Sequence, residues 1–210
     1  MKILSPTKEN LRIAANAIKS GLLVAFPTET VYGLGADGFN PSAVTNVFKA
    51  KKRPPYQSLS LMLPDKSFVE KIAEVESEKV KMLIEKFLPG PLTIVLPKKD
   101  FVPEIVTGGK KTVGIRIPAN QIALKFLSLT ETPIVAPSAN LFGQPSPTTA
   151  MNVAEQLGEG VDFIIDGGKT DLRIASTIIQ VVNNKYTLLR QGAISVKEIE
   201  KEIDVKIVVD

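Results

Sequence analysis

Short apolar runs alternate with amphipathic segments along the whole chain, and this alternation constrains the fold more than any other feature of the sequence. Residues 22–26 form a continuous apolar run that Pro27 ends, which is typical of a strand buried on both faces. Apolar residues recur at helical spacing over residues 11–18, with Gly21 as the stop. Strands and helices that mix from end to end, without a Gly/Ser-rich break, predict one α/β domain over residues 1–210 around a large mixed twisted sheet.

The same patterns place the remaining elements. Ser195 and Glu198 form a capping box that starts a helix, and Asn183-Asn184-Lys185 is typical of a hairpin turn. Further helices are predicted around residues 41–51, 80–88, 123–127 and 153–157. Strands are predicted over residues 59–63, 92–96, 112–117, 134–136, 161–165, 176–182, 186–189 and 205–209.

The N-terminal sequence and the lengths of the apolar runs bear on localisation. No apolar run approaches the ~20 residues that a membrane-spanning helix needs. The N-terminus meets Pro6 and then charged residues before any hydrophobic segment, so no signal peptide is expected. These features predict a cytoplasmic protein.

The composition excludes several kinds of site, because the chain contains no Cys, no His and no Trp. A Ser-His-Asp triad, a Cys nucleophile and the thiolate or imidazole ligands of structural zinc are all ruled out. The 26 Lys and Arg exceed the 22 Asp and Glu, which gives a formal net charge of +4. That mild excess permits a polyanionic ligand but does not by itself identify a nucleic acid as partner.

Residues 27–35 crowd hydroxyls, a carboxylate and Tyr32 at the end of the predicted buried strand. A capped turn would explain one Thr and one Gly, whereas the whole group indicates a ligand pocket. Gly33, Gly35 and Gly38 match G-x-G-x-x-G by letter, but they do not directly follow a strand and no acid occurs near position 58. A dinucleotide site is therefore not predicted here.

Two basic segments are candidate anion sites. Residues 49–55 place cations at the end of a helix, where they either complement the helix dipole or hold Arg53 against phosphate oxygens on a backbone stiffened by prolines. Arg116 alternates with Ile115 and Ile117 along a strand and points opposite to them. It is either an exposed edge charge or a bidentate clamp for a carboxylate.

A polar loop over residues 136–149 leaves a strand and enters a helix. Ser146, Thr148 or Thr149 can cap that helix. Capping leaves Ser138 and Asn140 unexplained, and small polar groups beside exposed helix N–H donors are typical of an anion or nucleotide site.

Taken in order, residues 27–35, 51–54, 114–118, 138–148 and 189–192 resemble the YrdC/TsaC family of threonylcarbamoyl-AMP synthases. The resemblance covers nearly the whole chain. It implies a YrdC-like sheet with a concave basic face, and a reaction that joins L-threonine, bicarbonate and ATP into threonylcarbamoyl-adenylate and pyrophosphate. It also implies Mg²⁺ carried by the nucleotide, no metal site of the protein's own, and a downstream tRNA threonylcarbamoyl transferase that places the group on tRNA adenosine.

The resemblance also implies roles for particular residues. Threonine would be held by Thr30, Arg116, the Ala136 backbone and Ser176. ATP would be held by Lys51, Arg53, Thr112, Ser138, Asn140, Ser146 and Arg190, with Lys51 and Arg53 as catalytic cations.

One position departs from the family, because Met62 stands where a threonine-contacting His is common. This leaves room for a YciO-like paralogue with a different acceptor. An RNA-binding module of the same fold, in direct contact with double-stranded RNA or tRNA, is a further alternative. The chain ends at Asp210, which predicts the stand-alone domain without the C-terminal extension of longer relatives.

Overall fold

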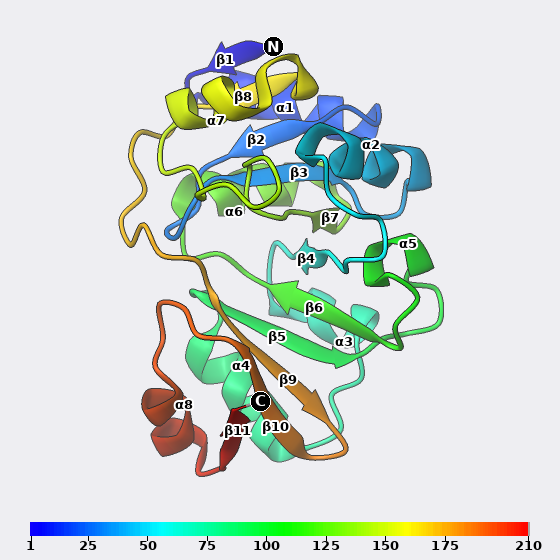
Figure 1. Cartoon of the computed structure of the whole chain (residues 1–210), viewed down its shortest axis with the longest axis vertical. Coiled ribbons are helices and arrows are strands. Elements are labelled where there is room, and N and C mark those ends of the chain that lie inside the picture. The colour runs from blue at the N-terminus through cyan, green and yellow to red at the C-terminus, as the bar shows by residue number, and fades with distance from the viewer. Residues whose placement is uncertain (210) are drawn as a thin grey trace.

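A computed structural model describes residues 1–209 and shows one mixed sheet that runs through the whole molecule (Figure 1). Its eleven strands lie in the order β1-β8-β2-β3-β7-β4-β6-β5-β9-β10-β11. The strands are β1 (Lys2–Leu4), β2 (Val24–Phe26), β3 (Gly33–Asp37), β4 (Ser60–Met62), β5 (Leu92–Pro97), β6 (Thr112–Arg116), β7 (Ile134–Val135), β8 (Phe163–Ile165), β9 (Thr177–Val182), β10 (Lys185–Arg190) and β11 (Ile207–Val209). Parallel and antiparallel neighbours occur together, as the sequence predicts.

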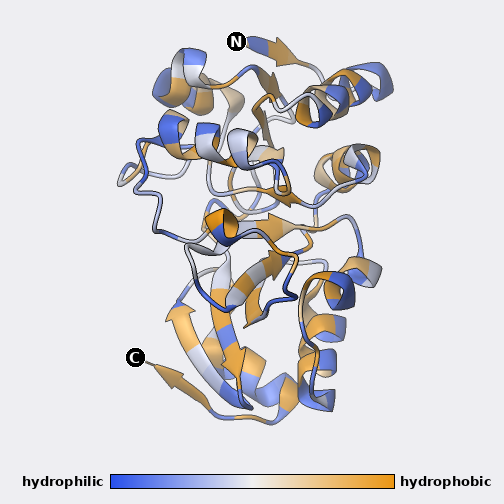
Figure 2. Cartoon of the chain, turned by 90° about the vertical axis from the view of Figure 1, so that its right-hand side faces the viewer, coloured by the Kyte–Doolittle hydropathy of each residue, from blue (hydrophilic) through white to orange (hydrophobic). Residues whose placement is uncertain are grey.

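Amphipathic helices cover the sheet, and in Figure 2 they alternate between hydrophobic and hydrophilic colours along their length. Most of the longer helices begin at a residue whose side chain accepts a backbone N–H, such as Thr7, Asn40 and Thr149. The helices are α1 (Lys8–Lys19), α2 (Pro41–Lys51), α3 (Val69–Ile72), α4 (Glu78–Phe87), α5 (Glu104–Thr107), α6 (Gln121–Thr130), α7 (Ala150–Leu157) and α8 (Val196–Ile203). None of the helices in residues 1–209 is long and apolar enough to cross a membrane.

Strand β2 lies between two hydrophobic clusters, which confirms the prediction of a strand buried on both faces. Val24 and Phe26 pack into the cluster that α1 and α6 share, whereas Ala25 joins the larger cluster with α2. All three side chains are fully buried. Strand β2 ends at Phe26 between β8 and β3, and the residues that follow Pro27, such as Thr28 and Thr30, are buried, so the loop begins inside the molecule.

The predicted helices and strands are confirmed, several with little change of bounds. The helix predicted over residues 41–51 is α2, and the strand predicted over residues 92–96 is β5. Asn183 and Asn184 both take positive φ angles, 51° and 56°, which suits the tight turn between β9 and β10. Ser195 accepts the N–H of Glu198 at 3.2 Å, as a cap does.

Two strands were not predicted. The short β1 pairs with β8 at one edge of the sheet. Residues 33–35, predicted as part of a loop, belong to β3, which pairs with β2. A Cβ on Gly35 would lie 3.1 Å from the side chains of Ile134 and Phe26, so this glycine allows close packing inside a strand. Because its glycines lack side chains, β3 shows no hydrophobic period in the sequence.

Candidate active site

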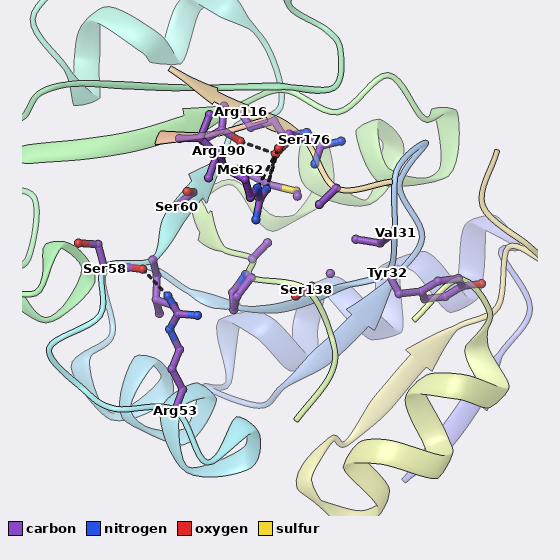
Figure 3. A pocket seen from close by; sticks show the side chains of 17 residues that line it. Val31, Tyr32, Arg53, Ser58, Ser60, Met62, Arg116, Ser138, Ser176 and Arg190 are labelled. Carbon is purple, nitrogen blue, oxygen red and sulfur yellow. Dashed lines mark hydrogen bonds between the residues drawn. The ribbon is translucent and has the colours of Figure 1, made fainter. Parts of the chain in front are cut away.

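A cavity of about 160 Å³ opens where the loops after β2 and β7 face β4, β6 and β9 (Figure 3). It is smaller than the ~300–1,000 Å³ of sites that enclose a drug-sized ligand, so only a small molecule fits wholly inside. Six of the predicted site residues line it, namely Arg53, Arg116, Ala136, Ser138, Ser176 and Arg190. The sequence reasoning did not predict Ser58, Ser60 and Thr93 as lining residues.

Backbone hydrogen bonds hold the two predicted loops side by side. Tyr32 donates its N–H to Pro147, and Leu34 donates its N–H to Pro137. Ala139 donates in return to the carbonyl of Tyr32 at 2.8 Å. The cap of α7 is Thr149, one of the three candidates. These bonds explain how segments more than 100 residues apart in the chain form one wall of the cavity.

Arg116 is 5% exposed and lies on a central strand, so the interpretation as an exposed edge charge is wrong. Its Nη2 donates to Glu29 Oε1 at 2.8 Å and to Thr30 Oγ1 at 2.9 Å, and its Nε donates to the carbonyl of Gly90 at 3.2 Å. Since a guanidinium has five N–H donors, these bonds leave the two on Nη1 for a ligand. A carboxylate therefore finds one nitrogen here rather than the fork that a bidentate clamp requires.

Arg53 and Arg190 also line the cavity, but neither forms an ion pair within the described residues. Arg190 donates from Nε and Nη2 to the carbonyl of Ser176 at 3.1 and 2.8 Å, and Arg53 donates from Nη2 to the carbonyl of Ser58 at 2.9 Å (Figure 3). Desolvation lowers the pKa of both groups, and the charge of Arg116 lowers that of Arg190 further. Because two of the three lining guanidiniums have no carboxylate partner within residues 1–209, the cavity is electropositive and suited to an anion.

The loop behind Arg116 is organised by Thr28. Its hydroxyl accepts the N–H groups of Thr30 and Val31, at 3.1 and 3.2 Å, and lies 2.8 Å from the hydroxyl of Thr30. Thr30 is fully buried and contacts Arg116 from outside the cavity lining. Glu29, which no prediction assigned to a role, supplies the only carboxylate that pairs with a cation of this site in residues 1–209.

The other predicted site residues lie outside the lining. Lys51 is 1% exposed, and its Nζ donates to the carbonyls of Ser138 and Asn140. Asn140 uses its amide on the carbonyls of Leu141 and Gln144. Thr112 begins β6 opposite Pro97, two residues from Gly114 and four from Arg116. Ser146 lies in the same loop as Asn140, partly exposed.

Burial, together with the smaller effect of the nearby charge of Arg53, lowers the pKa of Lys51 from its usual 10.5 to about 7. The unfolded chain therefore binds more protons than the folded one between pH 7 and 10.5, so stability rises with pH across that window. Relative to Lys51→Met, the wild type should gain up to a few kcal/mol of unfolding free energy from pH 7 to 10, at about 1.4 kcal/mol per pKa unit. Urea unfolding at several pH values measures this.

Lys49→Met is the matched control for this pH dependence, because Lys49 is an exposed lysine on the same helix. Its stability difference from the wild type should stay flat with pH. A flat difference for Lys51→Met as well would show that Lys51 titrates normally in the folded state.

Tyr32 ties the segment between β8 and β9 to the cavity wall. Its hydroxyl donates to the carbonyl of Gly168 at 2.7 Å and accepts the N–H of Gly167 at 3.2 Å. Burial raises the pKa of this phenol to about 12, so the group remains a donor at ordinary pH. The same segment donates from Leu172 to the carbonyl of Glu29 at 2.9 Å and ends at Ala175, which lines the cavity.

Tyr32→Phe should lower the free energy of unfolding by about 1–2 kcal/mol, because it leaves the Gly167 and Gly168 groups without their partner. Tyr56→Phe is the control, since the side chain of Tyr56 is 71% exposed. That change should cost less than about 0.5 kcal/mol. Equal losses in urea unfolding would show that the Tyr32 hydroxyl does not hold the segment.

The chain is similar to known proteins in both sequence and structure. The Sua5, YciO and YrdC family model, described as telomere recombination, matches residues 16–192. The chain belongs to this family. Within the Sua5/YciO/YrdC family, it is 48% identical over 193 residues to the threonylcarbamoyl-AMP synthase of Pyrococcus abyssi, covering 92% of this chain and 57% of that protein. The expected family is thereby confirmed.

A second relative and a solved structure agree with this placement. The threonylcarbamoyl-AMP synthase of Bacillus subtilis is 41% identical over 201 residues, covering 95% of this chain and 58% of that protein. The crystal structure of P. abyssi Sua5 complexed with L-threonine matches with a TM-score of 0.96 at 44% identity, over 100% of this chain and 63% of that one. The predicted α/β fold is confirmed. The chain spans little more than half the length of these curated relatives.

Proposed function

We propose that this chain has threonylcarbamoyl-AMP synthase activity and joins L-threonine, bicarbonate and ATP into threonylcarbamoyl-adenylate and pyrophosphate. The observation that carries the proposal is the convergence of Arg53, Arg116 and Arg190 on one cavity, only one of them neutralised by a carboxylate. Such a site suits a zwitterion beside a polyphosphate. The names of its relatives, and the threonine complex of P. abyssi Sua5, support the same reaction.

Threonine would occupy the enclosed end of the cavity. Nη1 of Arg116 would donate to its carboxylate. The N–H of Ala136 donates to Ser60 at 3.1 Å, so its carbonyl is the backbone group left to accept from the threonine amine. Val31 and Met62 would supply apolar surface for the threonine side chain. Ser176, which Arg190 holds through its carbonyl and its hydroxyl, would lie where the two substrates meet.

ATP would place its phosphates against Arg53 and Arg190 and extend its nucleoside over the open side. Ser138, which lines the cavity, would contact the nucleotide. Lys51 would support the nucleotide site by holding the carbonyls of Ser138 and Asn140. Residues for the rest of the nucleotide, beyond the cavity, would be Thr112, Asn140 and Ser146.

In this reaction, the threonine amine bonds to the carbon of carbon dioxide, which bicarbonate supplies with loss of water, and gives a carbamate. A carbamate oxygen then attacks the α-phosphorus of ATP, and the bond from that phosphorus to the pyrophosphate oxygen breaks. The chain has no imidazole to serve as base. Its contribution would be to hold the reactants in line and to neutralise charge on the departing pyrophosphate with Arg53 and Arg190.

Mg²⁺ in this proposal arrives with the nucleotide. Residues 1–209 contain no group of three or more His, Cys, Asp or Glu side chains that could hold a metal ion. Glu29, which lies behind the cavity lining, is paired with Arg116. Phosphate oxygens would thus supply the ligands of Mg²⁺, which would neutralise charge there.

A downstream transferase would then move the threonylcarbamoyl group to tRNA, and direct contact of this chain with tRNA or double-stranded RNA belongs to the same proposal.

The test is pyrophosphate release by the purified chain given ATP, threonine and bicarbonate, with the adenylate identified by mass spectrometry. Release should require all three. Absence of threonine-dependent release would refute the proposal. Turnover with another amine would favour the YciO-like alternative, and salt-dependent RNA binding without turnover would favour the RNA-binding module.

A further inference from the structure

We propose that Glu29 is a positioning and specificity residue: it holds Arg116 in one orientation and offsets part of its charge, so that the amino-acid end of the cavity favours a single carboxylate over the polyphosphate. The inference rests on the proposed function, because it assigns the two ends of one cavity to the two substrates. It concerns a residue outside the cavity lining that touches neither substrate in this arrangement.

The contacts of Glu29 point to Arg116 alone. Glu29 Oε1 lies 2.8 Å from Arg116 Nη2, and the two side chains are 8% and 6% exposed. Its other oxygen, Oε2, is buried and has no hydrogen-bond partner within residues 1–209. Burying a carboxylate costs free energy unless a cation compensates its charge. Because Arg116 is the one side chain that Glu29 bonds to within residues 1–209, we infer that the role of Glu29 is to hold Arg116.

Glu29 determines which edge of Arg116 faces a ligand. Nη2 uses its two hydrogens on Glu29 and Thr30, while Nε is directed to Gly90. Only Nη1 remains, so a ligand carboxylate meets one nitrogen at a defined place. Without the carboxylate of Glu29, Nη2 would regain a donor and the guanidinium could turn.

Glu29 also separates the charges in the cavity. Arg53 and Arg190 are held by the carbonyls of Ser58 and Ser176, which leave their full positive charge in place. Arg116 would add a third uncompensated cation next to them if Glu29 were neutral. A triphosphate or pyrophosphate would then find favourable sites over the whole cavity and compete with the amino acid.

The backbone of Glu29 is held independently of its side chain. Its carbonyl accepts the N–H of Leu172 at 2.9 Å, and the hydroxyl of the preceding Thr28 caps the turn that follows. A substitution that keeps the size of the side chain should therefore leave the loop in place and change only the interaction with Arg116.

Glu29→Gln removes the charge, and Glu29→Asp keeps the charge but shortens its reach. With ATP saturating, both variants should raise KM for threonine by about 10- to 100-fold, the equivalent of one charge-assisted hydrogen bond, while KM for ATP changes less than about twofold. Inorganic pyrophosphate should become a competitive inhibitor against threonine in Glu29→Gln, with an inhibition constant at least about tenfold lower than in wild type. In Glu29→Asp and wild type, pyrophosphate should compete with ATP only.

The control is Asp162→Asn. The carboxylate of Asp162 also accepts a partly buried hydrogen bond, from the N–H of Leu23 at 2.8 Å, but it lies at the end of β2 away from the cavity. It should leave KM for threonine and the pyrophosphate pattern unchanged. Wild-type turnover with unchanged threonine KM and pyrophosphate pattern in Glu29→Gln would overturn the role of Glu29 but not the proposed function. Failure of both Glu29 variants to fold, judged by circular dichroism, would assign Glu29 to stability and overturn it too. A wild type without threonine-dependent turnover or threonine binding in calorimetry would overturn both.

Discussion

Replacing Arg116 by lysine is expected to lower kcat/KM for threonine by about 10²- to 10³-fold, the cost of losing one member of a buried hydrogen-bonded charge pair. Arg116 bonds to Glu29, Thr30 and Gly90 and still presents Nη1 to the cavity. A lysine has a single ammonium, which cannot satisfy these acceptors and reach a ligand at the same time. Steady-state kinetics with threonine varied at saturating ATP measure the effect.

This change should act on threonine far more than on ATP. Arg53 and Arg190 remain, so calorimetry should find ATP binding within a few fold of wild type. Arg12→Lys is the matched control, because Arg12 is exposed on α1, and it should leave both substrates unaffected. An Arg116→Lys variant that keeps its threonine KM but loses ATP binding would reverse the assignment of the two ends of the cavity.

Local sequence patterns predict those helices and strands whose own residues show which of their faces are buried. The helix over residues 41–51 follows an Asn cap and begins at a proline, and its apolar residues match its buried face. The apolar run over residues 22–26 predicts burial on both faces, which the structure confirms for Val24–Phe26, whereas Leu22 lies before the strand and is 39% exposed. Strand β3 was not predicted, because Gly33 and Gly35 have no side chains that could contribute to an alternating hydrophobic pattern. Their place in the sheet depends on close packing against neighbours such as Phe26.

The candidate site also has features that local sequence patterns predict and features that they do not. The polar residues at the end of a buried strand, and Arg53 before its prolines, were predicted as site residues, and several of them line the cavity. The pairing of Glu29 with Arg116 joins residues 87 positions apart, and no local pattern reports such a contact. For Lys51 the local pattern is misleading. A lysine in a basic run is typical of a solvated or phosphate-binding position, whereas the fold buries Lys51 against the carbonyls of Ser138 and Asn140.

Removing either uncompensated guanidinium, by Arg53→Ala or Arg190→Ala, is expected to lower kcat by about 10²- to 10³-fold, as the loss of one donor to developing charge does. Both groups line the cavity, and both are held by carbonyls that leave their charge unopposed. KM for threonine should change little in Arg53→Ala, because Arg116 and Glu29 keep their contacts, whereas Arg190→Ala also frees Ser176 and should raise it. Single-turnover measurements of pyrophosphate formation separate this effect from product release.

The double variant tests whether the two groups act on the same leaving group. If Arg53 and Arg190 share one pyrophosphate, the loss of both should be clearly smaller than the product of the single losses, because the second removal acts on a transition state that the first has already disabled. Lys49→Ala removes the same charge from an exposed position four residues before Arg53 and should retain the wild-type rate. A strictly multiplicative loss would place the two guanidiniums on separate parts of the nucleotide, and a normal rate in either single variant would remove that arginine from the phosphate end.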